Sequence, residues 1–371
     1  MWTFTLPTKI QFGPGVAASL NKIPEVARRT VAVVTDPVIA KLPKVRELVA
    51  SLEAVLVYDQ VRPNPTVENV DTLTALLREK NVQTVVAIGG GSSLDCAKAA
   101  SCLCKTEDAS VRTYHFEAKK TFQGEHLPVV TVPTTAGTGS EVTPIAVLDD
   151  EEKNFKGPIG SPCFAPVCAV VDPELTVSVP LQVTAATALD ALSHAIEGYW
   201  SKNHQPICNT LAKEAAKIIF ANLPKIYNDL TSIAGREAIS YAALIAGIAF
   251  QMPKNAIMHA CSFPLSNRAH LSHGAACAFT MEASIRLNTP AMNGRMEEFA
   301  NYCGFATVDA MIAAITELKK NGGLPCTLAD AGIDSEMVEL LIKESFHPLL
   351  NNNPKTVTED DLRTIYAELA D

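Results

Sequence analysis

Short apolar runs that end in polar or turn residues recur along the first half of the chain. These runs cover residues 30–36, 54–59, 84–90, 128–134 and 168–173. Because helical stretches such as 67–80 and 92–104 separate them, the pattern predicts βαβ units and a buried parallel sheet. Residues 2–12 alternate apolar and polar positions, which predicts an outlying strand.

The pattern changes near residue 180, after which helical periodicity replaces the β-branched runs. Helices are predicted over residues 184–200, 206–221, 231–251, 274–287, 293–303, 307–321, 335–345 and 358–369. We therefore expect two domains, an α/β domain over residues 1–180 and an all-α domain over residues 181–371. A packed junction between two such domains is a common place for an active site.

Composition and charge narrow the class of protein. The 371 residues are 47% hydrophobic and 19% charged, a balance that excludes an intrinsically disordered chain. The formal net charge is −9 and no run of lysine or arginine occurs, which argues against a nucleic acid as partner. Uninterrupted apolar runs all fall short of the about 18 residues that a membrane span needs, and residues 1–15 lack a signal-peptide pattern.

The ten cysteines indicate a reducing compartment. They are scattered along the chain, and none forms a CxxC pair. In a chain without a signal-peptide pattern, this usage favours free thiols over a disulfide framework. The sequence therefore predicts a cytoplasmic protein without a membrane partner, in which most cysteines are small buried apolar residues.

A glycine-rich segment, VVAIGGGSSLDCAK, links a predicted strand to a predicted helix. Gly89, Gly90 and Gly91 end the strand. Ser92 starts the helix and, with Asp95, has the spacing of a capping box. Glycines allow a ligand to approach the backbone, and free N–H groups at a helix start attract anions. The segment therefore predicts a phosphate site; the alternative is a tight turn that binds no ligand.

A second polar loop, TVPTTAGTGSEVTP, follows the next apolar run. Thr134, Thr135 and Thr138 supply hydroxyl groups, and the glycines among them permit close approach. Two such loops at neighbouring strand ends favour the pyrophosphate of a dinucleotide, with a polar surface loop as the alternative. Asp36, at the end of the first run, suits ribose hydroxyls and would repel a 2′-phosphate, which favours NAD over NADP. A turn or N-cap aspartate is an equally open alternative.

One carboxylate and three histidines in the helical half form a candidate metal site. Asp190 and His194 are four residues apart and therefore share one face of a predicted helix. His259 lies near a helix end before Pro264, and His273 stands just before the next helix. If these ends meet the face of the first helix, the four donors suit Fe(II) or Zn(II) with an open position for a substrate oxygen. Ordinary core and surface histidines are the alternative.

These motifs, in this order, resemble the iron-containing (group III) alcohol dehydrogenase family. The matching segments are GGGSSLDCAK, PTTAGTGSEVTP, VVDPELT, DALSHAIEGY and NNNPKTVTEDDL, and they span nearly the whole chain. The resemblance implies an α/β N-terminal dinucleotide-binding domain plus an all-α C-terminal domain, an architecture shared with dehydroquinate synthase. It also implies a homodimer or a larger homo-oligomer.

The resemblance implies roles for individual residues. The family's metal ligands fall on Asp190, His194, His259 and His273. Its residues that contact the dinucleotide fall on two loops and three further positions, namely Gly89, Gly90, Gly91, Ser92, Thr134, Thr135, Asp36, Asn64 and Lys156.

Some positions depart from the family pattern. Phe263 stands where many members have a further histidine, which removes the usual imidazole from the route of the proton, and Pro158 stands where a glycine is usual. Arg268 and His270 replace small or aromatic residues and are the candidate catalytic side chains. A cation there would suit a substrate with a carboxylate, sulfonate or phosphonate tail. For Arg268, a surface or helix-capping arginine is the alternative.

The implied activity is metal-dependent hydride transfer between NAD(H) and a short-chain primary alcohol or aldehyde. The divalent ion is expected to polarise the substrate oxygen, and His270 is a candidate proton relay. One alternative is an NAD- and metal-dependent lyase of the dehydroquinate synthase type. Another is a metal- and nucleotide-binding homologue that has lost catalysis.

Overall fold

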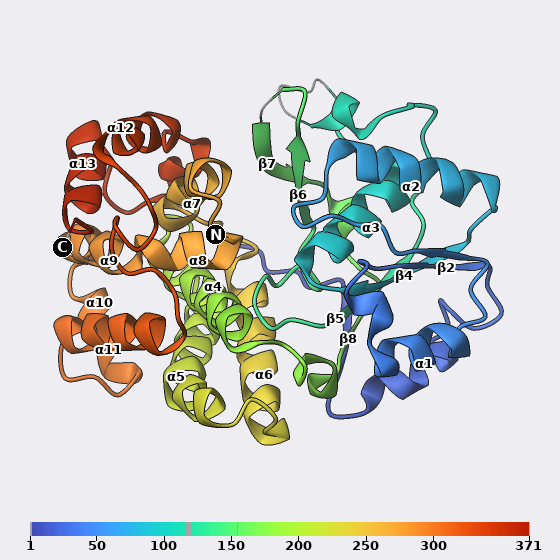
Figure 1. Cartoon of the computed structure of the whole chain (residues 1–371), viewed down its shortest axis with the longest axis horizontal. Helices are drawn as coiled ribbons and strands as arrows, with labels where there is room; N and C mark the ends of the chain where they lie inside the picture. Colours follow the sequence, from blue (N-terminus) through green and yellow to red (C-terminus); the bar gives the residue numbers. More distant parts are fainter. Residues whose placement is uncertain (1, 116–119, 154, 371) are drawn as a thin grey trace. The chain divides into compact units, whose positions relative to one another are not determined.

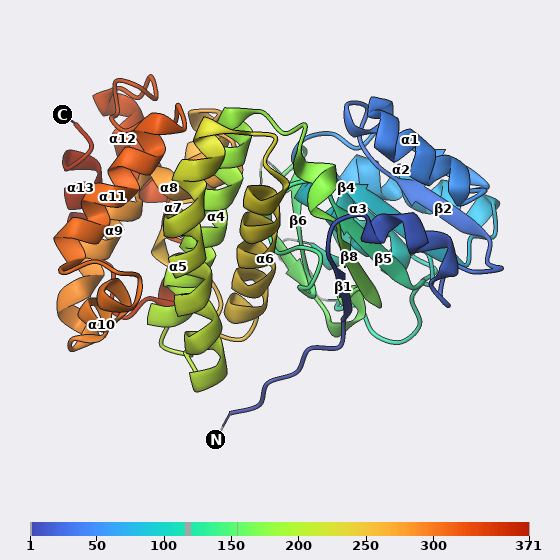
Figure 2. The ribbon, with the colours of Figure 1, turned by 90° about the horizontal axis from the view of Figure 1, so that it is seen from below.

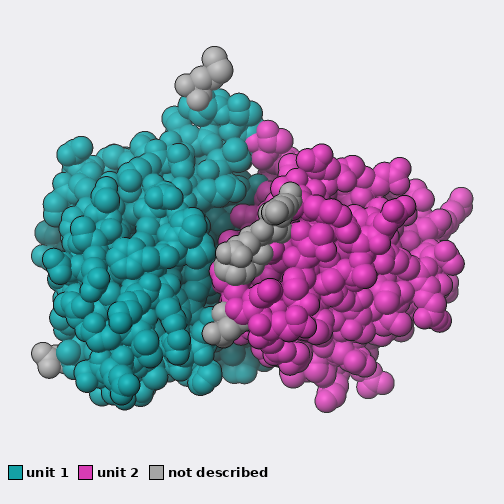
Figure 3. Space-filling model, turned by 90° about the horizontal axis from the view of Figure 1, so that it is seen from above, with its two compact units in different colours: residues 1–4, 178–371 teal, residues 5–177 magenta. Residues whose placement is uncertain are grey.

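The computed structural model describes residues 2–115, 120–153 and 155–370, and it divides the chain into two compact units (Figures 1 and 3). One unit is Thr5–Val177, and the other is Ser178–Asp371 together with Met1–Phe4. The first unit combines helices with a parallel sheet. The described part of the second unit holds helices and no strand. The predicted fold class, α/β followed by all-α, is confirmed.

Six parallel strands form the main sheet of the unit Thr5–Val177. In spatial order they are β1 (Lys9–Phe12), β8 (Cys168–Val171), β5 (Val129–Pro133), β4 (Thr84–Gly89), β2 (Val31–Val34) and β3 (Leu56–Tyr58). The apolar runs of the sequence contain all of these strands except β1. Parallel β4 and β5 pair up to Gly89 opposite Pro133, so the glycine and threonine segments leave the sheet side by side.

Helices cover both faces of this sheet (Figure 1). They are α1 (Pro43–Ser51), α2 (Val67–Glu79) and α3 (Gly91–Leu103), with 3-10 helices at Val16–Lys22, Ile39–Lys41, Val111–Tyr114, Pro162–Phe164 and Pro173–Thr176. Alternate residues of β2 face two cores: Ala32 and Val34 pack with α2 and α3, whereas Val31 and Val33 pack with α1. Burial on both faces explains why the strands read as continuous apolar runs.

The predicted strand over residues 2–12 is wrong for its first half. Only Lys9–Phe12 forms a strand, which pairs with β8 from Lys9 opposite Cys168 to Phe12 opposite Val171. Residues 2–7 have no regular structure, and Trp2 is 53% exposed. Pro7 lacks the N–H group that a paired strand uses, so the apolar alternation before it does not continue into the sheet.

An antiparallel pair of strands follows the threonine loop, although the apolar runs do not predict it. The pair consists of β6 (Ile145–Asp150) and β7 (Phe155–Gly160), with Ile145 opposite Gly160. Pro158 lies in β7 opposite Val147. A proline is tolerated there because β7 has a single partner strand and its other edge needs no hydrogen bonds.

Ten α-helices belong to the described part of the unit that begins at Ser178. They are α4 (Leu181–Trp200), α5 (Pro206–Asn228), α6 (Ile233–Phe250), α7 (Ile257–Arg268), α8 (His273–Phe279), α9 (Met281–Asn288), α10 (Arg295–Tyr302), α11 (Val308–Asn321), α12 (Ser335–Glu344) and α13 (Glu359–Ala367), with 3-10 helices at Thr289–Met292 and Pro348–Asn352. The long helices α4, α5 and α6 lie side by side (Figure 2).

Two features of this unit differ from the expectation. Helix α7 runs through Pro264, whereas the sequence placed a helix end before that proline. The helix predicted over residues 274–287 is two helices, α8 and α9, which are separated at Thr280 with a ψ of 5°. Residues on both sides of this break are buried, so apolar periodicity alone does not reveal it.

Helix α6 is long and apolar enough, by length and composition alone, to cross a membrane. Of its 18-residue window, 67% is buried inside the structure, where α6 packs against α4 and α5. Core helices pass the same test, and no other helix among the described residues does. We therefore interpret α6 as a core helix.

Candidate functional site

Helix α4 places three buried polar side chains on one face. Asp190, His194 and Glu197 are spaced i, i+4 and i+7, so they follow one another along that face. Each is at most 3% exposed. Groups buried to this degree need a partner, because burial of an unpaired charge is strongly unfavourable.

Helices α7 and α8 bring two more imidazoles to this face. His259 is the third residue of α7, and His273 is the first residue of α8. Gly274 lets α8 begin directly against α4, because a Cβ added there would lie 2.2 Å from the carbonyl oxygen of Ala186. This close approach carries His273 to Asp190.

The four predicted metal ligands meet around one carboxylate oxygen. From Oδ1 of Asp190, the Nε2 atoms of His273, His259 and His194 lie at 3.7, 3.9 and 4.0 Å. The Nε2 atoms of His259 and His194 are 3.0 Å apart. Two ligands of one tetrahedral ion, each bound at roughly 2.1 Å, are separated by about 3.4 Å, so these spacings fit a shared divalent cation.

Asp190 gives an independent reason to expect a cation. Its Oδ1 atom is buried and has no hydrogen-bond partner within the described ranges. Burial raises the pKa of Asp190 to about 6, and the neighbouring His259 offsets this only in part. A divalent cation held by the surrounding imidazoles would satisfy this oxygen, and oxygen with imidazole nitrogen is a donor set suited to Fe(II) or Zn(II).

Glu197 orients His259 through the other ring nitrogen. Nδ1 of His259 lies 2.7 Å from Oε2 of Glu197, and two backbone N–H groups near the start of α7 donate to the same carboxylate at 2.9 and 2.7 Å. Because an ionised carboxylate only accepts, Nδ1 carries a proton and Nε2 is the atom left for a metal. Glu197 was not predicted from the sequence, although its i+7 spacing from Asp190 within DALSHAIEGY is a usable signal.

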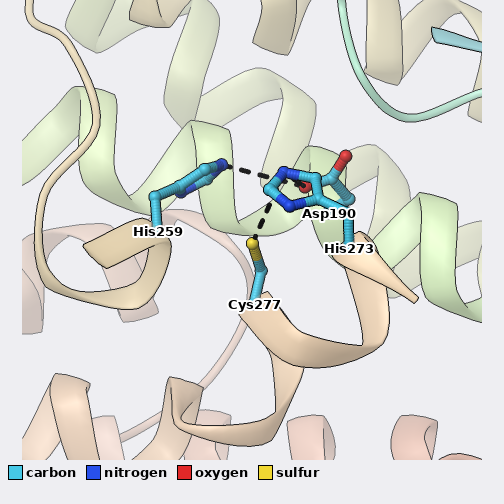
Figure 4. A group of neighbouring side chains, drawn as sticks. All are labelled: Asp190, His259, His273 and Cys277. Carbon is cyan, nitrogen blue, oxygen red and sulfur yellow. Dashed lines mark hydrogen bonds and ion pairs between the residues drawn. The ribbon is translucent and has the colours of Figure 1, made fainter. Parts of the chain in front are cut away.

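A sulfur atom also belongs to this group, and the sequence analysis did not include it. Each donor atom of the group lies within 4.8 Å of every other, and the donors come from Asp190, His259, His273 and Cys277 (Figure 4). Cys277 follows His273 by four residues on α8, and its Sγ lies 3.8 Å from Nε2 of His273. His194 stands beside this group, in contact with His259.

The glycine and threonine segments form a second candidate site, within the unit Thr5–Val177. A Cβ added to Gly91 would lie 2.8 Å from Cγ2 of Thr138, and one added to Gly90 would lie 3.5 Å from Oγ1 of Thr135. The two segments are therefore packed against each other. Since α3 begins at Gly91, its first N–H groups and the positive end of its dipole lie here, as an anion such as a phosphate requires.

Asn64, Ser92 and Lys156 meet beside the start of α3. The backbone N–H of Asn64 donates to Oγ of Ser92 at 3.2 Å, and Nζ of Lys156 donates to Oδ1 of Asn64 at 2.9 Å. Asn64 has a φ of 55°, a left-handed conformation that asparagine tolerates. Three residues that the resemblance implies as cofactor contacts thus form one hydrogen-bonded group with a cationic end.

Asp36 and Thr134 border the glycine segment. Oδ1 of Asp36 accepts the N–H groups of Val38 and Ile39 at 2.9 and 3.0 Å, which is the turn-capping role that the sequence left open. Its Oδ2 would lie 3.6 Å from a Cβ added to Gly89. Thr134 donates its N–H to the carbonyl of Gly89 at 2.9 Å, and its buried hydroxyl has no partner in the described part of the chain.

The predicted capping box of Ser92 and Asp95 is wrong. Gly90 is the N-cap of α3, and no side chain bonds to the first N–H groups of the helix. Asp95 instead accepts the hydroxyl of Ser140 at 2.5 Å and a backbone N–H of β6 at 2.8 Å. Lys98 pairs with Asp95 at 3.2 Å and donates to three backbone carbonyls of the threonine loop and β6. This buried pair fixes the threonine loop against α3.

Arg268 and His270 are not among the mutually close donors. Arg268, at the end of α7, forms an ion pair with Glu344 of α12 through Nε and one terminal nitrogen, and both side chains are more than a third exposed. His270 is exposed and has a φ of 55°. The structure favours the surface interpretation of Arg268, and a catalytic role for either residue stays a prediction. Phe263 is buried, with its ring centroid 4.9 Å from that of His347.

Two family models together match most of the chain. The model described as iron-containing alcohol dehydrogenase matches residues 7–173. The C-terminal model of the Fe-containing alcohol dehydrogenase family matches residues 184–370.

Named relatives and a solved structure match along the full length. Choline dehydrogenase from Bacillus subtilis is 34% identical, covering 98% of this chain and 94% of that protein. NAD-dependent methanol dehydrogenase from Bacillus methanolicus is 31% identical, covering 98% and 99%. The crystal structure of sulfoacetaldehyde reductase from Bifidobacterium kashiwanohense in complex with NAD+ is 42% identical, with a TM-score of 0.94, covering 100% of this chain and 99% of that one.

Proposed function

Because the chain belongs to the iron-containing alcohol dehydrogenase family, we propose that it is a metal-dependent oxidoreductase that reduces a short-chain aldehyde bearing an anionic tail, with NADH as the hydride donor. The observation that carries the proposal is the convergence of three imidazole nitrogens within 4.0 Å of the buried Oδ1 of Asp190. Such a buried set of donors suits a catalytic divalent cation.

The chain's own residues bind and orient the reacting groups. Asp190, His194, His259 and His273 would hold Fe(II) or Zn(II), with Glu197 fixing the ring of His259. When bound, the cation would supply Lewis-acid polarisation of the substrate oxygen, and the nicotinamide would supply the hydride. The role of the protein is to keep these groups oriented and away from competing reactions.

The nucleotide would be held by the loops of the α/β unit. The start of α3 at Gly91 offers N–H groups to the pyrophosphate, and Lys156 with Asn64 and Ser92 provides a cation and polar atoms beside it. Asp36 adds a carboxylate next to Gly89, which suits ribose hydroxyls and would repel the 2′-phosphate of NADP. NAD(H) is therefore the proposed coenzyme.

The anionic tail of the substrate is supported by the likeness to sulfoacetaldehyde reductase, which extends over the full length at 42% identity. Arg268 does not add support, because Glu344 already pairs with its guanidinium group. We therefore propose a sulfonate- or carboxylate-bearing aldehyde without assigning its charge to Arg268.

A panel of aldehydes tests the proposal directly. Protein loaded with Fe(II) or Zn(II) is given NADH with sulfoacetaldehyde, or with propionaldehyde as a neutral partner of similar length. We expect kcat/KM to be higher for the anionic aldehyde by about tenfold or more, which corresponds to roughly 1.4 kcal/mol of transition-state binding.

Each outcome of this panel has a distinct meaning. Equal rates for the two aldehydes would remove the anionic tail from the proposal and leave the oxidoreductase. Failure of the loaded protein to consume NADH with any aldehyde would overturn the proposed reaction. Net consumption of NADH also separates this reaction from that of a dehydroquinate synthase-type lyase, which regenerates its nucleotide.

A further inference from the structure

Cys277 occupies a position from which its sulfur can reach the same cation as the four predicted ligands. It lies one helical turn after His273 on α8, so both side chains project from one face of that helix. Its Sγ is 3.8 Å from Nε2 of His273 and within 4.8 Å of the donor atoms of Asp190 and His259. Figure 4 shows the sulfur directed toward the imidazole of His273.

The spacing of Cys277 and His273, which is also that of a sulfur–imidazole hydrogen bond, fits two ligands of one ion. In an ion with five or more ligands, a sulfur bound at roughly 2.3 Å and a nitrogen bound at roughly 2.1 Å lie about 3.1–3.8 Å apart when the angle between them is about 90–120°. The observed 3.8 Å between Cys277 and His273 lies at the upper end of this range, and the 3.7 Å between His273 and Asp190 is similar. The convergence of three imidazole nitrogens within 4.0 Å of the buried Oδ1 of Asp190 independently points to a cation at this place.

Burial alone does not distinguish Cys277, because several other cysteines are equally buried. Cys208 of α5 is also fully buried, yet it belongs to no group of metal-donor side chains among the described residues. A buried thiol in such surroundings is a small apolar residue. Cys277 differs from Cys208 because donor atoms of one carboxylate and two imidazoles lie within 4.8 Å of its sulfur atom.

We infer that Cys277 is a sulfur ligand of the divalent cation, which makes the centre a mixed oxygen, nitrogen and sulfur site that prefers Zn(II) or Co(II) to Mn(II). The inference rests on the proposed function, because it concerns the same cation. On binding, the thiol loses its proton to solvent and the thiolate forms the metal–sulfur bond, so charge and protons balance. Sites of nitrogen, oxygen or sulfur donors already bind Mn(II) less tightly than Co(II) or Zn(II), and a soft thiolate widens this difference because Mn(II) favours oxygen donors.

Cobalt substitution tests for the metal–sulfur bond. Metal-free protein is loaded with Co(II), and the near-ultraviolet spectrum is examined for thiolate-to-cobalt charge transfer, which a site of oxygen and nitrogen donors does not produce. We expect the absorption in the wild type and in Cys208→Ser, and we expect its loss in Cys277→Ser and Cys277→Ala. The wild-type spectrum decides the question even if the variants of Cys277 fail to fold.

The preference between Zn(II) and Mn(II) provides a second test, because replacing a purely structural cysteine would not change this preference. In Cys277→Ser, we expect the Kd for Zn(II) to rise by about 100-fold or more and the Kd for Mn(II) by less than about tenfold. Competition with a chromophoric chelator measures both values. Equal losses for the two ions would contradict the inference.

Failure of this inference can be told apart from failure of the proposed function. Stoichiometric binding of Co(II) without a charge-transfer band in the wild type would overturn the sulfur ligand alone. The same holds if the band persists in Cys277→Ser. If the wild type binds neither Co(II) nor Zn(II), both the sulfur ligand and the proposed metal site are wrong.

Discussion

At the scale of single residues, Glu197 orients one predicted ligand of the proposed metal site without being a predicted ligand itself. Its carboxylate accepts hydrogen bonds from Nδ1–H of His259 and from two backbone N–H groups, and these three bonds fix the position of the carboxylate. That position fixes the ring of His259 and leaves Nε2 directed toward Asp190. Partners of this kind raise the basicity of the imidazole and reduce its freedom to rotate.

The variant Glu197→Gln should weaken metal binding while the fold is retained. A neutral amide keeps the size of the side chain, but it can present its NH2 group to His259 and release the ring. We expect the Kd for Zn(II) to rise by about 10–100-fold, the usual cost of losing such a partner. Titration calorimetry on metal-free protein measures it, and the exposed Glu317→Gln is the matched control. An unchanged Kd would show that Glu197 only satisfies the backbone of α7.

We expect Glu141 to make the stability of the α/β unit depend on pH. Its side chain is 5% exposed, and burial raises its pKa to about 7 from 4.5, with the nearby Lys98 acting in the opposite direction. The folded protein therefore binds this proton more tightly than the unfolded chain. The stability that Glu141 contributes is complete below about pH 4.5 and is lost as the pH rises through about 7.

The variant Glu141→Gln should remove this loss. We expect wild type and variant to have similar free energies of unfolding near about pH 4.5, and the variant to be more stable by about 3 kcal/mol near about pH 8. Urea unfolding at the two pH values measures the difference, with the exposed Glu107→Gln as control. The Lys98–Asp95 pair faces the same loop and is present in both proteins. Parallel pH profiles for wild type and Glu141→Gln would contradict the assignment.

At the scale of elements, the glycine segment and the threonine loop function as one unit. They leave adjacent parallel strands, and the buried Lys98–Asp95 pair holds the loop against α3. Gly91 is needed where the two meet, because an added Cβ would lie 2.8 Å from Thr138. A side chain there has to displace the loop that we propose for the pyrophosphate.

The variant Gly91→Ala should therefore weaken NADH binding without unfolding the protein. Overpacking of about 1–3 kcal/mol predicts a rise in the Kd for NADH of about tenfold, measured by nicotinamide fluorescence. Gly160→Ala is the matched control, because its added Cβ would make only ordinary contacts, the nearest at 3.9 Å. The double variant Gly91→Ala/Thr138→Ser removes the nearest atom and should recover part of the affinity. A normal Kd in Gly91→Ala would argue against a nucleotide at this loop.

Strong local patterns predicted most of the elements. Strands of a parallel sheet are buried on both faces, so they read as continuous apolar runs. The long helices of the second unit follow from their helical periodicity. The failures have local causes. Pro7 interrupts an alternating segment, and the helix break at Thr280 lies between residues that are buried on both sides. Strand β6 ends in two aspartates next to its turn, so the β6–β7 pair does not read as an apolar run.

The sequence predicts those parts of the candidate site for which residue type and spacing along one helix are sufficient. Asp190 and His194 share a helix face by spacing alone, whereas the approach of His259 and His273 depends on how α7 and α8 pack against α4. Cys277 was overlooked because a cysteine in an apolar helix reads as core. Its role depends on neighbours that are distant in sequence, and the same is true of the ion pair between Arg268 and Glu344.

At the scale of the whole molecule, the two units hold different candidate sites. All residues of the candidate metal centre belong to Ser178–Asp371, and all residues of the proposed nucleotide site belong to Thr5–Val177. Each unit is compact by itself, so loss of one ligand should leave the binding of the other largely intact. The expected homo-oligomer and the cytoplasmic location stay predictions.

Removal and return of the metal is the measurement that tests the account most directly. NADH oxidation with an anionic short-chain aldehyde is followed in chelator-treated wild type, before and after Fe(II) or Zn(II) is restored, while the Kd for NADH is measured on the same samples. If the proposed metal-dependent reaction is right, turnover falls by about 100-fold or more without metal and returns when metal is restored. The Kd for NADH then changes by less than about twofold. Full turnover by protein shown to be metal-free would contradict the proposed reaction.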